Sequence, residues 1–171
     1  MGEPKKKRKV YDAVKSPWNF KLLGDELKLI GEYGLKNKRE LRTYRATLRK
    51  IRTAVRETFS LSENDKNIKN VEIIGRLSKL GLIPDNSSID SILKLGLKEI
   101  LERRLQTIVF RKGIAQTPYQ ARQLITHGHI LVNNNVIKKP GFFVNSIDVE
   151  KVNLILKAHL FPYKKYKKMS E

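Results

Sequence analysis

The sequence predicts an α+β protein: a helical N-terminal half, then a small unit of two helices and a short β-hairpin sheet, with basic, extended ends. Two patterns predict it. Apolar residues recur at steps of three and four over residues 36–59, as on one face of a long helix. From residue 97 the pattern changes to a helix, a capped second helix and a hairpin, which together make a small α+β unit.

The length agrees with this division, because 171 residues suffice for one compact domain or two small ones. We expect four segments: a basic arm over 1–20, a helical domain over 21–96, a mixed α/β domain over 97–158 and a basic tail over 159–171. The path of the tail is open, and packing back onto the helical domain is one alternative.

Charge is the strongest compositional signal. Lys and Arg number 36 against 17 Asp and Glu, which gives a net charge of +19. Such a chain repels itself, and a polyanion relieves the repulsion. Nucleic acid is the first candidate partner. An anionic membrane is disfavoured, because the helix over 36–59 lacks the Trp- and Phe-rich face that inserts into lipid.

Several classes of protein are excluded. Without Cys there is no disulfide framework, thiolate zinc site or thiol nucleophile. The three His residues (His127, His129 and His159) lack an accompanying acidic cluster, so no metal site is expected. The sequence contains no phosphate-binding loop, nucleophile elbow or dinucleotide fingerprint. We therefore expect a binding protein that is not an enzyme and needs no cofactor.

The N-terminus carries an uninterrupted basic segment over residues 4–10, PKKKRKV. Its cations are Lys5, Lys6, Lys7, Arg8 and Lys9. The segment cannot bury an apolar face, so we expect it to be extended when free. It resembles a monopartite nuclear import signal letter for letter, and an arm that lies on phosphates remains an equal alternative.

The helix over 36–59 has two distinct faces. Its apolar stripe consists of Leu41, Tyr44, Leu48, Ile51, Val55 and Phe59. A row of cations recurs with the same period, displaced by about 100° around the axis, and comprises Lys38, Arg42, Arg45, Arg49, Arg52 and Arg56. A solvated surface helix usually mixes charge signs at i,i+4. This row does not, which favours phosphate binding by the planar guanidinium groups.

Shorter elements surround this helix. A short helix over 26–35 precedes it, and a polar break over 61–70 follows. A further helix over 71–81 ends at Gly81, and a loop covers 84–90.

The second half predicts a helix that starts at 97 and ends at Gly113. Next, Thr117 and Gln120 form a capping box with Pro118 at the first helical position, and this second helix ends at Gly128. A hairpin follows over 130–137 with a turn at 133–135, and 142–149 suggests further short strand.

The cations of this unit are expected to gather on one nucleic-acid side. The first helix presents Arg103, Arg104, Thr107 and Arg111 within one arc. The further residues that are placed to join them are Lys112, Arg122, His127, His129, Lys138 and Lys139.

This second half resembles the alpha-L RNA-binding motif. The matching residues are Arg103-Arg104-Leu105, Thr117, Gln120-Ala121-Arg122-Gln123-Leu124-Ile125, His127-Gly128-His129-Ile130 and Val132-Asn133. The motif also occurs in pseudouridine synthases and in a class of aminoacyl-tRNA synthetase. Residues 26–40, ELKLIGEYGLKNKRE, and 102–107, ERRLQT, resemble more narrowly the eukaryotic branch of small-subunit ribosomal protein number four, which eukaryotes number nine.

The resemblance implies a structural constituent of the small ribosomal subunit. Such a protein is a primary rRNA-binding protein that organises the 5′ domain of the rRNA and lies near the channel through which mRNA enters. The implied partners are small-subunit rRNA, neighbouring ribosomal proteins including the one numbered five in bacteria, and mRNA as a further contact. No membrane partner and no homo-oligomer are expected. The implied location is the cytoplasmic ribosome, after nuclear and nucleolar passage during assembly.

When the motif is matched residue by residue, the resemblance implies that seven positions face rRNA: Arg103, Arg104, Thr117, Gln120, Arg122, His127 and His129. The alternative function is that of a small-subunit processome assembly factor of the same family. An RNA-modifying enzyme is disfavoured, because the chain outside the motif has no acid–base constellation.

Overall fold

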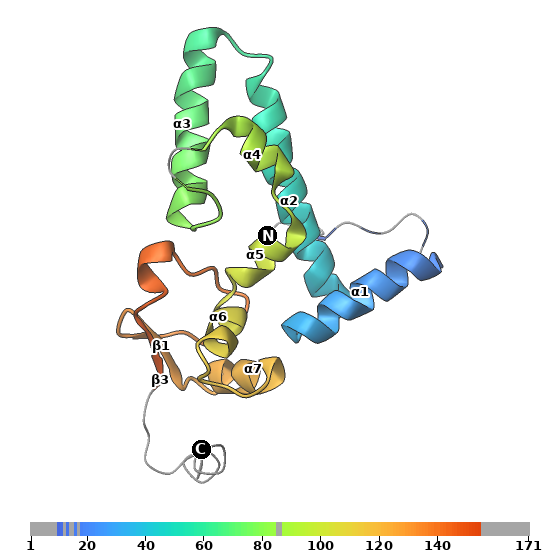
Figure 1. The fold of residues 1–171 in the computed structure, drawn as a ribbon, viewed down its shortest axis with the longest axis vertical. Helices are drawn as coiled ribbons and strands as arrows, with labels where there is room; N and C mark the ends of the chain where they lie inside the picture. Colours follow the sequence, from blue (N-terminus) through green and yellow to red (C-terminus); the bar gives the residue numbers. More distant parts are fainter. Residues whose placement is uncertain (1–9, 12, 14–15, 17, 85–86, 155–171) are drawn as a thin grey trace, which may run out of the picture.

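The computed structural model describes residues 10, 11, 13, 16, 18–84 and 87–154. Seven α-helices come first in this part of the chain, and a three-stranded antiparallel sheet follows them in the sequence (Figure 1). The α+β prediction with a helical N-terminal half is therefore confirmed. The elements are α1 (Phe20–Tyr33), α2 (Lys38–Thr58), α3 (Glu63–Lys79), α4 (Ile89–Lys94), α5 (Leu97–Glu102), α6 (Leu105–Arg111), α7 (Pro118–Thr126), β1 (Ile130–Val132), β2 (Asn135–Val136), the 3-10 helix η1 (Ser146–Asp148) and β3 (Val152–Leu154).

Helix α2 is the spine of the helical part. It contacts α1, α3, α4 and α5, and with α3 it forms the long hairpin that projects from the rest of the fold (Figure 1). Asn37 caps its start, where the side-chain oxygen accepts a hydrogen bond from the Glu40 amide at 3.0 Å. The expected helix over 36–59 is thus present.

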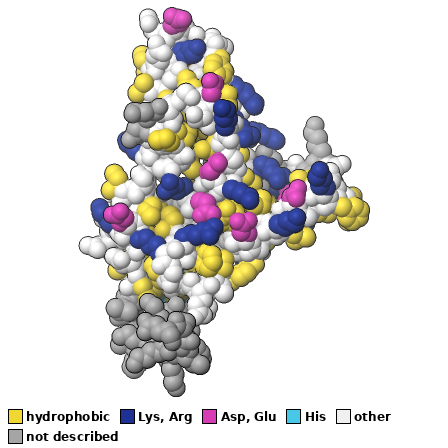
Figure 2. All heavy atoms as spheres, viewed as in Figure 1, with side chains coloured by type: hydrophobic (Ala, Val, Ile, Leu, Met, Phe, Trp, Pro, Cys, Tyr) yellow, Lys and Arg dark blue, Asp and Glu magenta, His cyan; other side chains and the backbone are white. Residues whose placement is uncertain are grey.

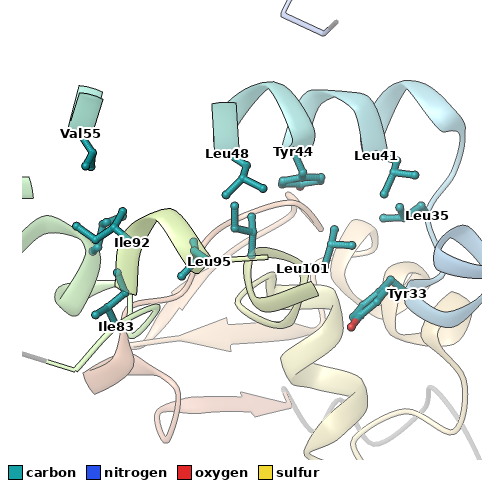
Figure 3. Close-up of a cluster of buried hydrophobic side chains, with 12 residues drawn as sticks. Tyr33, Leu35, Leu41, Tyr44, Leu48, Val55, Ile83, Ile92, Leu95 and Leu101 are labelled. Atoms are coloured by element: carbon teal, nitrogen blue, oxygen red, sulfur yellow. The ribbon is translucent and has the colours of Figure 1, made fainter. Parts of the chain in front are cut away.

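Two hydrophobic cores hold the fold. The first is built around the apolar stripe of α2, where Leu41, Tyr44 and Leu48 point toward Leu95 and Leu101 (Figure 3). The second joins α6 and α7 to the sheet. One member of the predicted stripe was assigned wrongly: Phe59 follows the end of α2 and is 48% exposed.

The polar break expected over 61–70 is wrong for most of its length, because α3 already begins at Glu63. The Ser62 hydroxyl donates a hydrogen bond to the Asp65 carboxylate at 2.7 Å, and two acidic residues occupy the first turn. Carboxylates there interact favourably with the helix dipole. Polar composition at this point signals a helix start rather than a loop.

The single helix expected from 97 to Gly113 is also wrong, because the chain breaks between α5 and α6 at Arg103 and Arg104. The backbone amides of Leu105 and Gln106 bond to the carbonyls of Phe142 and Pro140, at 2.8 and 3.2 Å. Pairing with a distant segment therefore replaces helical hydrogen bonds at this point.

The second predicted helix and the hairpin are present. Thr117 caps α7 by accepting from the Gln120 amide at 3.1 Å, while the Gln120 side chain accepts from Gln116 rather than closing the box on Thr117. The turn residues Asn133 and Asn134 both have positive φ, 52° and 64°, which gives the two-residue turn that suits a hairpin.

The strand expected over 142–149 is wrong in place. Phe143 makes only an isolated bridge to Arg104, and the third strand is β3, which pairs with β1. The domain boundary at residues 96 and 97 stays a prediction, although α5 contributes Ile100 and Leu101 to the first core.

Candidate nucleic-acid interface

The row of cations on α2 forms one face, but its members have different roles. Arg45, Arg49, Arg52 and Arg56 line a shallow groove of about 230 Å³ with Leu48. Arg49 and Arg56 are exposed, whereas Lys38 is half-buried. The cations of α2 therefore share one face, and the exposed part of that face, with Arg49 and Arg56, is accessible to a phosphate backbone.

The inner members of the row bond to protein groups. The Glu26 carboxylate of α1 is fully buried and pairs with Arg42 at 3.5 Å and with Arg45 at 3.3 Å. The Arg52 guanidinium donates to the Leu95 carbonyl at 2.8 Å. These three arginines connect α1 and the turn after α4 to α2. Their guanidinium groups are therefore partly engaged by protein groups.

Arg104 requires a correction. The prediction that it faces RNA is wrong for this structure, because its side chain is fully buried. Its guanidinium lies 4.8 Å from the centre of the Tyr44 ring and 3.7 Å from Glu40. Burial of the charge is tolerated here because an aromatic face and a carboxylate surround it.

Glu40 joins the two halves of the fold. Its carboxylate accepts two hydrogen bonds from the Arg122 guanidinium of α7, at 2.6 and 3.1 Å. Burial raises the pKa of Glu40, but the bonds from Arg122 and the Lys36 amide outweigh it and hold the pKa below its usual value. Arg122, predicted to face RNA, is therefore first of all a structural partner.

Three more predicted cations are engaged by the protein. Arg103 donates to the Gly81 carbonyl, and Arg111 pairs with Glu102 at 2.9 Å. The Lys112 ammonium donates to the Glu150 carbonyl at 3.0 Å. Arg111 and Lys112 remain exposed, so their outer atoms stay accessible to a ligand.

Further polar residues lie at the end of α7 and after the hairpin, where His127 is exposed and His129 is half-buried. The imidazole rings of His127 and His129 lie nearly parallel, with centres 6.1 Å apart. Gly128 between them has φ +76°, a backbone conformation that favours glycine. Lys138 and Lys139 after the hairpin are exposed as well. Thr117 and Gln120 lie on the opposite end of α7, where both serve its cap.

Two predicted features lie outside the described residues. They are the basic segment with Lys5, Lys6, Lys7, Arg8 and Lys9, and the tail over 159–171 with His159. Among the residues that are described, no helix is long and apolar enough to cross a bilayer, and no group of His, Asp and Glu is arranged to hold a metal ion.

Comparison with known proteins identifies the family. The S4 domain family matches residues 103–149, which comprise α6, α7, β1, β2 and most of the segment before β3. Across 156 residues the chain is 44% identical to the small ribosomal subunit protein uS4 of Saccharolobus islandicus, with 91% of this chain and 84% of the relative covered. This chain belongs to the uS4 family.

Two further uS4 relatives cover the chain as fully. The uS4 protein of Ignicoccus hospitalis is 42% identical over 163 residues, which are 95% of this chain and 96% of the relative. That of Hyperthermus butylicus is 41% identical over 165 residues, 96% of this chain and 92% of the relative. The similarity therefore extends well beyond the S4 domain into the helical half.

Sequence reasoning missed a polar cluster between the end of α1 and helices α5 and α6 of this uS4 chain. Glu102 accepts from the Tyr33 hydroxyl at 3.0 Å and pairs with Arg111. Burial, with the hydrogen bond to Glu102, raises the pKa of Tyr33. A cavity of about 470 Å³ opens next to the cluster, between the end of α3 and α5 and α6. The residues are far apart in sequence, and no local pattern indicates the cluster.

Proposed function

We propose that this chain is a structural constituent of the small ribosomal subunit that binds rRNA and has no catalytic role. Membership of the uS4 family at 44% identity over 91% of the chain carries the proposal. The net charge of +19 and the S4 domain at residues 103–149 support it, because a basic RNA-binding protein needs both positive charge and a fixed surface.

Finer roles follow from the resemblance seen in the sequence. We infer that the chain binds the rRNA early, organises its 5′ domain and lies near the channel through which mRNA enters. Its neighbours then include the ribosomal protein numbered five in bacteria. Residues 26–40 and 102–107 support assignment to the eukaryotic branch. The basic segment over 4–10 supports nuclear and nucleolar passage before work in the cytoplasm.

The interface that we propose uses the exposed cations. Its helical part is the outer end of the α2 row, and its S4-domain part is the side with His127, Lys138 and Lys139. Arg42, Arg45, Arg52, Arg103 and Arg122 would act through both structure and charge, since each already bonds to a protein group.

A salt titration of rRNA binding tests the proposal. The logarithm of the affinity for 5′-domain rRNA should fall steeply with the logarithm of the salt concentration, because each phosphate contact releases counterions. Replacing Lys138 and Lys139 by glutamine should lower that slope by about two units. The matched control replaces the exposed Lys94 and Lys98 of α4 and α5, and should leave the slope unchanged.

A flat slope for the unaltered chain would refute rRNA binding through charge. Co-sedimentation distinguishes the alternative role: a ribosomal constituent remains on mature small subunits, whereas an assembly factor is found only on their precursors.

A further inference from the structure

Helix α1 is apolar on more of its surface than the other described residues cover. Its inner face packs on α2 and carries the buried Glu26 and Tyr33. The adjacent outer face, about 100° around the axis, carries Phe20, which is 86% exposed, and Leu27, which is 58% exposed. Trp18, just before the helix, is 83% exposed. Large exposed apolar side chains grouped in this way mark a surface that something else covers.

Two glycines lie on the same outer face. Residues 20, 24, 27 and 31 follow one another at steps of four, three and four, so Phe20, Gly24, Leu27 and Gly31 share one side of the helix. A Cβ atom added at Gly24 or Gly31 would meet nothing within 4 Å. Glycine in a helix interior is disfavoured relative to alanine. No contact in the described chain requires it here, so the open space suits an outside group that approaches the backbone closely.

Positive charge lies along one edge of this outer face, and exposed acidic residues of α1 lie beyond it. Lys21 and Lys28 are exposed along its edge, and Lys36 and Arg39 are exposed just after the helix. Figure 2 shows hydrophobic side chains at the free end of α1 with Lys and Arg side chains beside them. On its underside, Glu26 pairs α1 with the first part of the α2 cation row. The outer face of α1 is therefore a surface separate from the outer end of the α2 row.

We propose that the outer face of α1 binds unpaired rRNA nucleotides, with bases stacked on Trp18 and Phe20 and the sugar–phosphate backbone passing over Gly24 and Gly31. Exposed aromatic rings among cations suit single-stranded RNA, because unstacked bases bind aromatic faces and the phosphates bind the cations. The proposal rests on the proposed function and adds a contact that depends on stacking rather than on charge.

Trp18 supplies a direct readout, because it is the only tryptophan in the chain. Adding 5′-domain rRNA to the full chain should quench its fluorescence as a base stacks on the indole. Trp18→Leu and Phe20→Leu should each weaken binding by about 5- to 150-fold. The dependence on salt should keep its slope, since no charge is removed. Phe59→Leu, at the end of α2, is the matched control and should bind as the unaltered chain does.

The glycines provide a test that a purely structural role would fail. Gly24→Ala should raise the melting temperature of the free protein, because alanine favours the helix, and should still weaken rRNA binding. Gly75→Ala in α3 is the control: its added Cβ also meets nothing within 4 Å, so it should raise the melting temperature and leave binding unchanged.

The outcomes separate this proposal from the function beneath it. The stacking site would be overturned if rRNA left the Trp18 fluorescence unchanged and the two Leu variants kept their affinity for rRNA. Steep, salt-dependent binding in the same experiments would leave rRNA binding itself intact. A fluorescence change that requires other ribosomal proteins, and is absent with naked rRNA, would also overturn it and assign the face to a protein neighbour. Failure of the unaltered chain to bind rRNA at all would refute the function itself.

Discussion

Replacing Glu40 by glutamine should destabilise the fold more than any surface glutamate would. Glu40 lies 3.7 Å from the fully buried Arg104 and accepts two bonds from Arg122, whose side chain is 20% exposed. Removing one partner of a buried ion pair leaves the other charge uncompensated, which costs about 3–5 kcal/mol. The glutamine keeps a hydrogen-bond acceptor and the site is partly open, so we expect about 3 kcal/mol at neutral pH.

A thermal melt and a denaturant titration measure this effect. For a chain of this size the loss corresponds to a melting temperature lower by roughly 6–12 °C. Glu57→Gln is the control, because Glu57 is exposed and has no ion-pair partner among the described residues. Adding Arg104→Met to the Glu40→Gln variant should restore much of the stability, since an apolar replacement removes the buried charge itself.

The effect should also depend on pH with a defined sign. The pKa of Glu40 in the folded chain lies below its value of 4.5 in the unfolded chain. Its stabilisation is then complete above that value and is lost as the pH falls through the folded-state pKa. The difference in unfolding free energy between the unaltered chain and the Glu40→Gln variant should therefore become smaller at acid pH. A gap that is small at neutral pH, or constant down to acid, would refute the view that Glu40 compensates Arg104.

Four further outcomes are expected. Arg56→Gln should lower the salt slope of rRNA binding by about one unit at an unchanged melting temperature; Arg45→Gln should lower the melting temperature, because the buried Glu26 then keeps only Arg42. Gly128→Val should cost about 2 kcal/mol at φ +76°, and an unchanged melt with weaker binding would instead show direct RNA contact. A reporter fused to residues 4–10 should enter the nucleus, and one that stays cytoplasmic would leave the segment as a phosphate-binding arm.

Patterns over a few neighbouring residues predicted correctly those elements that depend on interactions between neighbouring residues. The helical period of α2, the cap at Thr117 and the asparagine turn after β1 all appear as expected, because each depends on residues close in sequence. The break between α5 and α6 could not be predicted in this way. It depends on hydrogen bonds to residues 140–144, and no period near Arg104 reports them.

The candidate site was harder to predict for the same reason. Charge and spacing identified which residues are cationic and which share a face. They could not show that Glu26, Glu40 and the Leu95 carbonyl would bind some of these cations, since these groups come from other elements. The resemblance carried Arg104 over to an RNA-facing position, but its side chain is buried against the Tyr44 ring and Glu40.

The buried Gln106 amide has a consequence for how the chain is made. Its nitrogen donates to the Gly34 carbonyl at 2.8 Å and to the Pro118 carbonyl at 2.9 Å, so one side chain ties the end of α1 to the start of α7. Proteins fold from the N-terminus as they leave the ribosome. The helical half emerges first, yet the Gly34 carbonyl lacks its Gln106 donor until residue 106 follows. A fragment that starts at 103 would likewise carry this amide without its Gly34 acceptor, so we expect the S4 domain of this chain to be less stable alone than within the full chain.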